Sequence, residues 1–343
     1  MLRCIQLGKK GLGTTAPNPM VGCVLVVEDT IIGEGFTSPF GGSHAEVNAL
    51  NSVPVKSLLK QATLYVSLEP CSHHGKTPPC VDTIIEHNLQ RVVIGTKDPN
   101  PKVAGKGVAK LKEAGIEVTV GVLEPECRWC LRRFLTYHTK KRPYIILKWA
   151  QSQDGFMAPE PALRDDTPQP YWISNEYSQQ LVHKWRSEEQ AILIGTQTAV
   201  RDNPSLTTRL WTGKNPVRVV IDRNLSVPKN AKLFDHMAKT LVITEVDDTS
   251  QYLKGIAYER IEFGKSLPLE LCKLFYKLEY TSIFIEGGPT TLESFIKSQL
   301  WDEARIFKSE ICFKKGLKAP QIAGTFIQSE KIEKDELLII KND

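Results

Sequence analysis

Between residues 70 and 80 the chain reads PCSHHGKTPPC, which places two cysteines, Cys71 and Cys80, at the ends of a short polar loop. The loop follows TLYVS (63–67), a β-branched and aromatic run typical of a strand, and leads into a helical pattern over Pro79–Asn88. A strand, a cysteine loop and a helix in this order indicate an α/β unit with metal-ligating side chains near a strand end.

Strand and helix patterns alternate on both sides of this loop. Before residue 144 the predicted strands are Val21–Val27, Thr63–Ser67, Arg91–Gly95 and Glu117–Val122, and the predicted helices are His44–Asn51 (with Ser43 as its N-cap), Pro79–Asn88 and Gly107–Ala114. After it the predicted strands are Tyr144–Trp149, Ala191–Gly195, Val217–Asp222, Thr240–Thr244 and Ser282–Glu286, with helices at Glu176–Ser187 and Thr290–Leu300. We therefore predict mostly parallel sheets.

The length and charge of the chain favour two domains. At 343 residues and 38.5 kDa the chain exceeds one small core. A basic, helix-ending stretch at 140–143 ends in Pro143, which favours a break. Residues 1–143 carry a net charge of +6 and residues 144–343 a net charge of −1. We place one domain at 1–143 and a second at 144–343.

His44-Ala45-Glu46 lies upstream of the cysteine loop, and His44 completes a three-ligand set with Cys71 and Cys80. One imidazole and two thiolates suit a zinc ion, and three protein ligands leave a fourth position open for water, as in catalytic zinc sites. Glu46, at the start of a helix, can act on that water as a general acid–base without binding the metal. The pattern predicts one zinc ion per chain and a catalytic Glu46.

His-x-Glu followed by Pro-Cys and a second Cys is the zinc-deaminase signature. Eight residues separate the cysteines here, whereas nucleic-acid and nucleoside deaminases usually have two. With TAPNPMVG (15–22) and KDPNP (97–101), the loop closely resembles the deaminase of riboflavin biosynthesis. Residues 144–343 are similar to the dihydrofolate-reductase-like riboflavin reductases. Nearly the whole chain thus resembles the bifunctional deaminase–reductase family of that pathway.

The resemblance implies a cytidine-deaminase-like three-layer domain followed by a dihydrofolate-reductase-like α/β domain. It also implies hydrolysis of the 2-amino group of 2,5-diamino-6-ribosylamino-4(3H)-pyrimidinone 5′-phosphate, then NADPH-dependent reduction of the ribosyl group to ribityl. Because this substrate carries a phosphate, His73 and Lys76 in the cysteine loop are candidate substrate contacts. Asn18, in a Pro-Asn-Pro turn, is a candidate for hydrogen bonding to the pyrimidine edge.

The second domain lacks a Gly-x-Gly-x-x-Gly element, so a Rossmann site of the usual kind is not predicted. A glycine pair after the strand Ser282–Glu286 leads into a helix, where backbone N–H groups can bind an anion such as a phosphate of NADPH. The resemblance implies cofactor contacts by Trp172, Thr198, Asp202, Gly287, Gly288, Pro289, Thr290 and Thr291. It implies substrate contacts by Arg186, Leu206, Arg209 and Glu286, with Lys148, Asp202 and Glu286 as proton-handling groups.

Composition narrows the class of protein. Hydrophobic residues make up 41% and charged residues 24%, and no apolar run reaches the length of a membrane helix, so we expect no membrane partner. Without a recognisable leader we expect a cytoplasmic protein with free or metal-bound cysteines. The small net charge does not demand nucleic acid, and a homo-oligomer is an expectation by analogy. Two alternatives stay open: a nucleic-acid-editing deaminase, and a deaminase whose second domain is an inactive scaffold.

Overall fold

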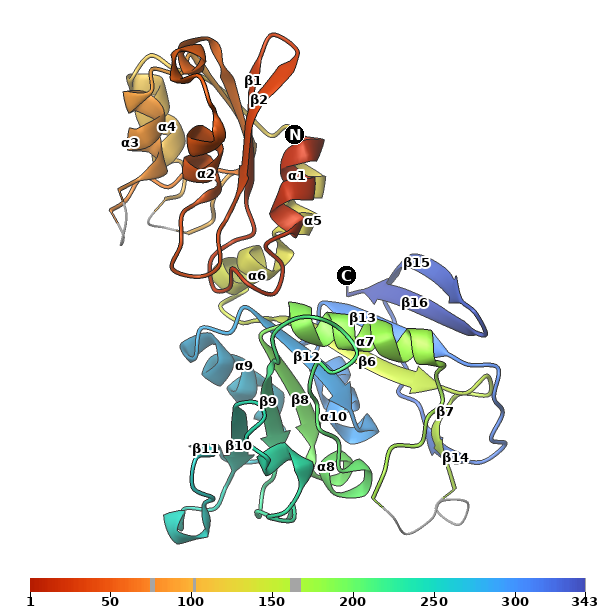
Figure 1. Cartoon of the computed structure of the whole chain (residues 1–343). Coiled ribbons are helices and arrows are strands. Elements are labelled where there is room, and N and C mark those ends of the chain that lie inside the picture. The colour runs from red at the N-terminus through yellow and green to blue at the C-terminus, as the bar shows by residue number, and fades with distance from the viewer. Residues whose placement is uncertain (75–77, 101–102, 161–167, 343) are drawn as a thin grey trace. The chain divides into compact units, whose positions relative to one another are not determined.

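The computed structural model describes residues 1–74, 78–100, 103–160 and 168–342. It divides into two compact units, Met1–Arg142 and Pro143–Asp343 (Figure 1). The division therefore falls at the proline that ends the basic stretch. Each unit has a sheet and a core of its own, and the two are described separately.

The first unit is a five-stranded sheet covered by helices. Its elements in chain order are α1 (Leu2–Lys9), β1 (Gly22–Val27), β2 (Thr30–Phe36), α2 (Ala45–Ser52), the 3-10 helix η1 (Lys56–Gln61), β3 (Thr63–Leu68), α3 (Cys80–Glu86), β4 (Arg91–Thr96), α4 (Lys106–Glu113), β5 (Glu117–Val120), α5 (Glu124–Cys130) and α6 (Arg132–Lys140). The strand order is β2-β1-β3-β4-β5.

The first sheet is half parallel and half antiparallel. β3 pairs in parallel with β4, and β4 with β5, whereas β1 is antiparallel to both β2 and β3. The prediction of a mostly parallel sheet is wrong here, because the chain turns back after β1 at Glu28, whose φ of 50° is left-handed, and forms the unpredicted strand β2. That strand, TIIGEGF, contains Gly33 and Gly35, which weaken its strand signal.

Helices on both faces make the first unit three layers. α2, α3 and α4 lie on one face of the sheet and α1 and α5 on the other (Figure 1). The larger core joins strand residues such as Leu64 and Ile94 to Leu50 of α2, Ile84 of α3 and Leu111 of α4. Removing these apolar side chains from water is the main term that holds the layers together.

The second unit is built on a nine-stranded sheet. Its elements in chain order are β6 (Tyr144–Gln151), β7 (Phe156–Pro159), α7 (Glu176–Glu188), β8 (Ala191–Gly195), α8 (Thr196–Asp202), β9 (Val217–Ile221), η3 (Lys232–Phe234), β10 (Thr240–Thr244), η4 (Thr249–Gln251), β11 (Ala257–Arg260), α9 (Leu267–Lys277), β12 (Ser282–Gly287), α10 (Pro289–Lys297), β13 (Glu303–Lys308), β14 (Gly316–Lys318), β15 (Thr325–Ile332) and β16 (Asp335–Lys341). The order in the large sheet is β11-β10-β9-β8-β12-β6-β13-β16-β15, and β7 pairs with β14.

Here the sheet is mostly parallel, as predicted. The strands from β11 to β13 pair in parallel, and the C-terminal strands β16 and β15 add an antiparallel edge. α7 and α8 pack on one face, through Trp185 and Ala199, and α9 and α10 on the other, through Phe275 and Phe295. The parallel strands are buried on both faces, which explains why they read as continuous apolar runs in the sequence.

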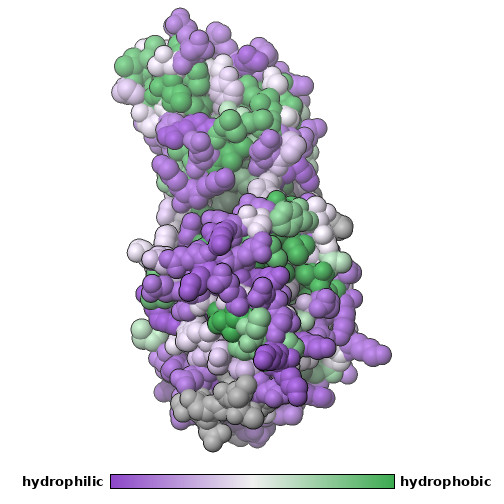
Figure 2. Space-filling view, turned by 90° about the vertical axis from the view of Figure 1, so that its right-hand side faces the viewer, coloured by the Kyte–Doolittle hydropathy of each residue, from purple (hydrophilic) through white to green (hydrophobic). Residues whose placement is uncertain are grey.

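The surface is mixed, and the cysteines are free. Figure 2 shows hydrophobic and hydrophilic side chains interspersed on the face in view, as on most folded proteins.

All eight cysteines are free thiols, in agreement with the sequence prediction. Across the described ranges, no helix combines the length and the apolar character that a membrane span requires.

Candidate active sites

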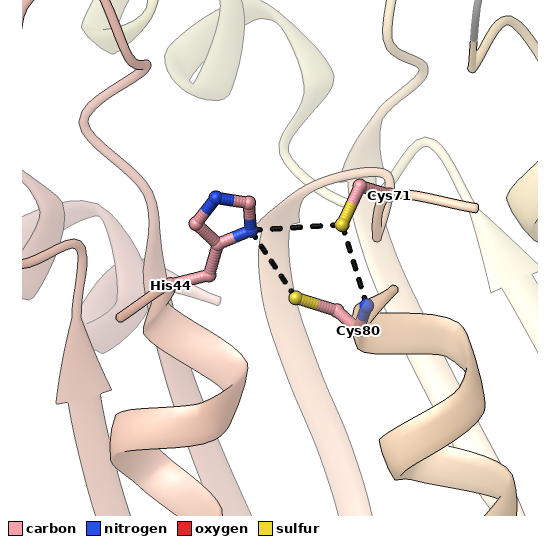
Figure 3. Close-up of side chains that lie close together, drawn as sticks. All are labelled: His44, Cys71 and Cys80. Carbon is pink, nitrogen blue, oxygen red and sulfur yellow. Dashed lines mark hydrogen bonds between the residues drawn. The ribbon is translucent and has the colours of Figure 1, made fainter. Parts of the chain in front are cut away.

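Three metal-ligating side chains converge in the first unit. The Nδ1 atom of His44 lies 3.3 Å from the Sγ atom of Cys80 and 3.6 Å from that of Cys71 (Figure 3). One ligand atom from each residue can be chosen so that all three lie within 4.8 Å of one another. One nitrogen and two sulfur donors are a set that zinc prefers, so the residues present fit a zinc ion.

The fold brings each ligand to the same end of the sheet. Cys71 lies in the loop after β3, and Cys80 is the first residue of α3, with its N–H donating to the Cys71 sulfur over 3.3 Å. His44 is the N-cap of α2, with extended φ and ψ angles, so the prediction of Ser43 as N-cap is wrong. The helix begins one residue later than predicted, and the cap position holds the metal-ligating imidazole instead of a capping hydroxyl.

A glycine on β2 allows α2 to come close enough to deliver His44. A Cβ atom on Gly35 would lie 2.3 Å from the backbone nitrogen of Ala49 and 2.6 Å from the carbonyl oxygen of Ala45. Any larger residue at position 35 would push α2 away from the sheet. The glycines that weaken the strand signal of β2 are thus required by the site.

The hydrogen bond between the two thiols shifts their pKa values in opposite directions. A hydrogen bond from Cys80, opposed by burial and supported by His44, lowers the pKa of the Cys71 thiol to about 4. The same hydrogen bond, together with burial, raises the pKa of Cys80. The hydrogen bond to Cys71 also raises the pKa of His44. One thiolate is therefore ready to bind a cation, and binding a metal through both sulfurs requires release of a proton.

Glu46 is the acid–base candidate beside these ligands. Its side chain is buried in the first turn of α2 and hydrogen-bonds with the Cys80 thiol. Burial, with a smaller contribution from the negative charge of Cys71, raises the pKa of its carboxyl to about 7. A carboxyl that titrates near neutral pH can both accept and return a proton, which is the property the sequence prediction requires.

Two further carboxylates near the site were not predicted. Glu69, buried at the end of β3, accepts hydrogen bonds from the N–H groups of Asp98, Gly105 and Val108 over 3.0 to 3.2 Å. Burial raises the pKa of Asp98 to about 6, and Cys71 is among the charges acting on it. The signal available in the sequence was a carboxylate at the end of an apolar strand, directly before Pro70-Cys71.

The substrate contacts predicted for the first unit are not joined to the three ligands as directly as Glu46 is. Asn18 is half-buried, and its N–H donates to the Thr15 carbonyl oxygen over 2.9 Å. His73 is exposed in the cysteine loop. Lys76 lies outside the described residues. Within the described ranges no hydrogen bond or ion pair joins Asn18 or His73 to the three ligands, so both substrate contacts stay predictions.

In the second unit one cavity gathers most of the predicted residues. It has a volume of about 390 Å³, within the range of small-molecule sites. From the predicted set it is lined by Lys148, Trp172, Arg186, Thr198, Asp202, Leu206, Arg209 and Glu286. These residues come from β6, from the end of β12, from the segment before α7, from α7 and α8, and from the loop after α8, and Ile194 near the end of β8 also lines the cavity. The cavity therefore opens at the carboxyl ends of parallel strands, the usual place for a ligand in such a sheet.

A buried ion network forms the floor of this cavity. Arg186 donates through Nε and Nη2 to the two carboxylate oxygens of Glu286, over 2.7 and 2.8 Å, and both side chains are about nine-tenths buried. Burial alone would raise the pKa of Glu286, but Arg186 and Lys148 outweigh it and lower the pKa. Burial lowers the pKa of Lys148 despite the charge of Glu286. The lysine is thus easier to deprotonate than an exposed one, while Glu286 is an anion.

The two arginines of the cavity differ. Arg186 makes three hydrogen bonds inside the protein. Two go to Glu286, and its Nη1 donates to the Thr207 carbonyl oxygen over 3.3 Å. Arg209 is exposed, and among the described contacts its guanidinium has no side-chain partner. The sequence treated both as suited to a phosphate, whereas among the described contacts only Arg209 has a guanidinium without a direct ion pair.

One histidine that lines this cavity was not predicted from the sequence. His183, buried on α7, lines the cavity and accepts a hydrogen bond from the N–H of Arg209 over 3.2 Å. Burial, followed by the charges of Arg186 and Arg209, lowers its pKa to about 4. Its spacing of three residues before Arg186, on one face of a helix, was the signal that could have identified it.

The glycine pair after β12 lies against the predicted cofactor contacts. A Cβ atom on Gly288 would lie 3.0 Å from the hydroxyl oxygen of Thr198, and one on Gly195 would lie 2.6 Å from that of Thr291. Gly287 has a φ of 127°, and a Cβ atom there would meet nothing within 4 Å. No side chain of the described residues caps α10 at this end, so the cradle fits an anionic group such as a dinucleotide phosphate.

Comparison with known proteins finds a matching family for each unit. The model of the family described as cytidine and deoxycytidylate deaminase zinc-binding region matches residues 1–96, and that of the RibD C-terminal domain matches residues 143–311. The riboflavin biosynthesis protein RibD of Aquifex aeolicus is 41% identical to this chain over 98% of the chain and 94% of the relative.

Two solved structures are similar over almost the whole chain. One is a diaminohydroxyphosphoribosylaminopyrimidine deaminase/5-amino-6-(5-phosphoribosylamino)uracil reductase from Thermotoga maritima, with a TM-score of 0.90 and 37% identity over 100% of this chain and 97% of that one. The other is RibD from Acinetobacter baumannii, with a TM-score of 0.87 and 31% identity over 99% and 97% of the two chains.

Proposed function

This chain belongs to the RibD family of bifunctional deaminase–reductases of riboflavin biosynthesis, and from that premise we propose which reaction each of its sites performs. The first unit deaminates 2,5-diamino-6-ribosylamino-4(3H)-pyrimidinone 5′-phosphate by hydrolysis. The second reduces the ribosyl group of the product to ribityl with NADPH. The observation that carries the proposal is the presence, in one chain, of the His44, Cys71 and Cys80 cluster and of a separate cavity built around Glu286.

In the first unit, His44, Cys71 and Cys80 would hold the zinc ion, and Glu46 would move protons. A zinc ion in such a site supplies the Lewis acidity that makes hydroxide available near neutral pH. Glu46 takes a proton while its carboxyl is ionised and returns it to the leaving amine, so that ammonia departs. The burial of Glu46 excludes bulk water. Its pKa of about 7 allows the same carboxyl to accept a proton and then to donate it.

In the second unit, the cradle around Gly287, Gly288 and Thr198 would hold NADPH, which supplies a hydride. Arg209 binds the substrate phosphate, because it lines the cavity and its side chain is exposed, without a direct ion pair among the described contacts. Glu286 accepts hydrogen bonds from the substrate, held in place by Arg186. Lys148 donates the proton that completes the reduction, because burial makes its ammonium group easier to deprotonate. Asp202 lines the same cavity and is a further candidate for proton handling.

The expected substrate follows from the same family membership. A phosphorylated pyrimidine is the expected partner, and the exposed charge of Arg209 matches one phosphate better than a polymer backbone. Cytoplasmic location, a homo-oligomer and the absence of a nucleic-acid partner stay predictions.

One assay tests both activities. The zinc-loaded full chain is incubated with the diaminopyrimidinone phosphate, first without and then with NADPH. We expect ammonia release without NADPH, followed by NADPH oxidation once deamination has occurred. Deamination of polynucleotides alone would refute the first assignment, and ammonia release without any NADPH oxidation would refute the second and favour a scaffold role.

A further inference from the structure

The loop after α8 is held along α7 by a series of contacts. The Thr207 carbonyl oxygen accepts a hydrogen bond from Arg186, and the Arg209 N–H donates to Nδ1 of His183. Further on, the ring of Trp211 lies 5.6 Å from the ammonium of Lys184. These contacts fix the main chain on both sides of the Arg209 side chain, so α7 determines where that guanidinium lies.

The far end of the same loop also approaches α7 closely. A Cβ atom on Gly213, whose φ is 157°, would lie 2.5 Å from the Cβ atom of Ser187. Loop residues 207, 209, 211 and 213 therefore each approach a residue in the same stretch of α7, between residues 183 and 187. The loop is packed along its length, while the Arg209 side chain stays exposed.

We propose that His183 is a positioning residue of the reductase site, which fixes the main chain at Arg209 so that its guanidinium faces the substrate phosphate. The inference rests on the proposed function, because it assumes a phosphorylated substrate. His183 acts through its Nδ1 atom, which accepts the Arg209 N–H over 3.2 Å. An acceptor is required at this place, because without one the N–H would lose its partner and the loop could shift along the helix.

The imidazole suits this role because it stays neutral. A protonated imidazole has a hydrogen on both nitrogens and could not accept from Arg209. Burial and the two flanking arginines, Arg186 and Arg209, lower the pKa of His183 to about 4, and Glu286 opposes them. The acceptor is therefore retained at neutral pH.

Asn and Leu at position 183 form a matched pair for the test. Their side chains have the same branched shape, but only Asn has an oxygen at the δ position, where His183 has its acceptor nitrogen. We expect His183→Leu to raise the KM for the phosphorylated substrate about 10-fold with kcat little changed, as for lost uniform binding. His183→Asn should stay near the unmodified protein. Gln180→Leu, on the exposed side of α7, is the control.

The phosphate end of the site provides the specific readout. Inorganic phosphate, used as a competitive inhibitor of NADPH oxidation, should bind His183→Leu more weakly than His183→Asn. The dephosphorylated substrate should show the same KM in all variants. The inference is overturned if Asn impairs the site as much as Leu, or if Leu raises KM equally for the phosphorylated and dephosphorylated substrates.

Two controls separate failure of this inference from other failures. Ammonia release by the first unit shows that each variant is folded there, and thermal unfolding shows it for the second unit. If His183→Leu does not fold, His183→Asn and His183→Gln replace the pair, since Gln carries its oxygen one atom farther out. Equal KM values in these two would overturn the inference. If the unmodified protein oxidises no NADPH, the proposed function fails instead.

Discussion

The first unit takes its metal ligands from residues 44–80, whereas the second builds its cavity from residues as distant as Lys148 and Glu286. In the first, a loop and two helix starts suffice to bring the ligands together. In the second, the strands β6, β8 and β12 must first pair before their ends meet. A local site can therefore be recognised by its spacing, while a dispersed site depends on the topology of the sheet.

The two sites also differ in how their charges are balanced. The thiols and imidazole of the first site form a donor set that fits a cation. In the second, Arg186, Glu286 and Lys148 compensate one another inside the protein. Substitutions in the first site should therefore abolish one activity without unfolding the unit, whereas substitutions at the buried Arg186–Glu286 pair of the second should affect both stability and activity.

The largest expected effect comes from a substitution at Glu46 in the first site. Glu46→Gln should lower ammonia release by about 10²- to 10⁴-fold, because it removes the group that moves protons while keeping its shape. Metal analysis should still find one zinc ion per chain, and NADPH oxidation on deaminated substrate should be unchanged. Glu113→Gln, on the exposed side of α4, is the matched control. Loss of zinc in Glu46→Gln would mean that the carboxylate supports the metal instead.

Arg186→Met tests whether the second site is part of the structural core. It leaves the buried Glu286 carboxylate without its main partner, so we expect the second unit to lose about 3–5 kcal/mol in its free energy of unfolding, measured by urea denaturation. Arg209→Met, at the exposed arginine, should leave stability unchanged and raise KM only. Equal stability of the two variants would contradict the distinction between the arginines.

Lys148→Met should lower the rate of NADPH oxidation by about 10²-fold while leaving ammonia release intact, since it removes the buried ammonium group but leaves Arg186 paired with Glu286. The exposed Lys214→Met is the control. If Lys148→Met is as active as the control, another group, such as Asp202, donates the proton.

The smallest effect concerns pH. His183 has its pKa lowered from 6.5 to about 4, so the unfolded chain binds a proton more readily than the folded chain between these values. The free energy of unfolding should therefore fall as the pH drops through this window, by at most about 1.4 kcal/mol per pH unit, and His183 should add no pH dependence above it. His183→Asn should flatten this part of the pH profile. An unchanged profile would show that the imidazole is not held neutral by its surroundings.

The sequence predicted the compact site because its chemistry is local. The spacing of His44, Cys71 and Cys80 and the helix start at Glu46 follow from short-range patterns. The same patterns failed for β2, because the glycines that admit α2 also weaken the strand signal. Ser43 was assigned the cap by residue preference, whereas the site requires an imidazole there.

The residues of the dispersed site were predicted only through family resemblance. Their ion pairs and hydrogen bonds became visible only in the structure. The pairing of Arg186 with Glu286 spans β12 and α7, which no local pattern connects. β15 was not predicted because it is an exposed edge strand with few apolar positions, so it lacks alternation. The role of His183 depends on a loop that crosses the helix, which the sequence does not show.

The central claim is that each unit holds a complete site of its own, and mixing two defective chains tests it most directly. Glu46→Gln and Lys148→Met are each incubated with the diaminopyrimidinone phosphate and NADPH, alone and together, and the ribityl product is measured. We expect little product from either variant alone and full conversion from the mixture, because the Lys148→Met chain deaminates and the Glu46→Gln chain then reduces. Failure of the mixture, while each variant keeps its remaining activity, would contradict two independent sites.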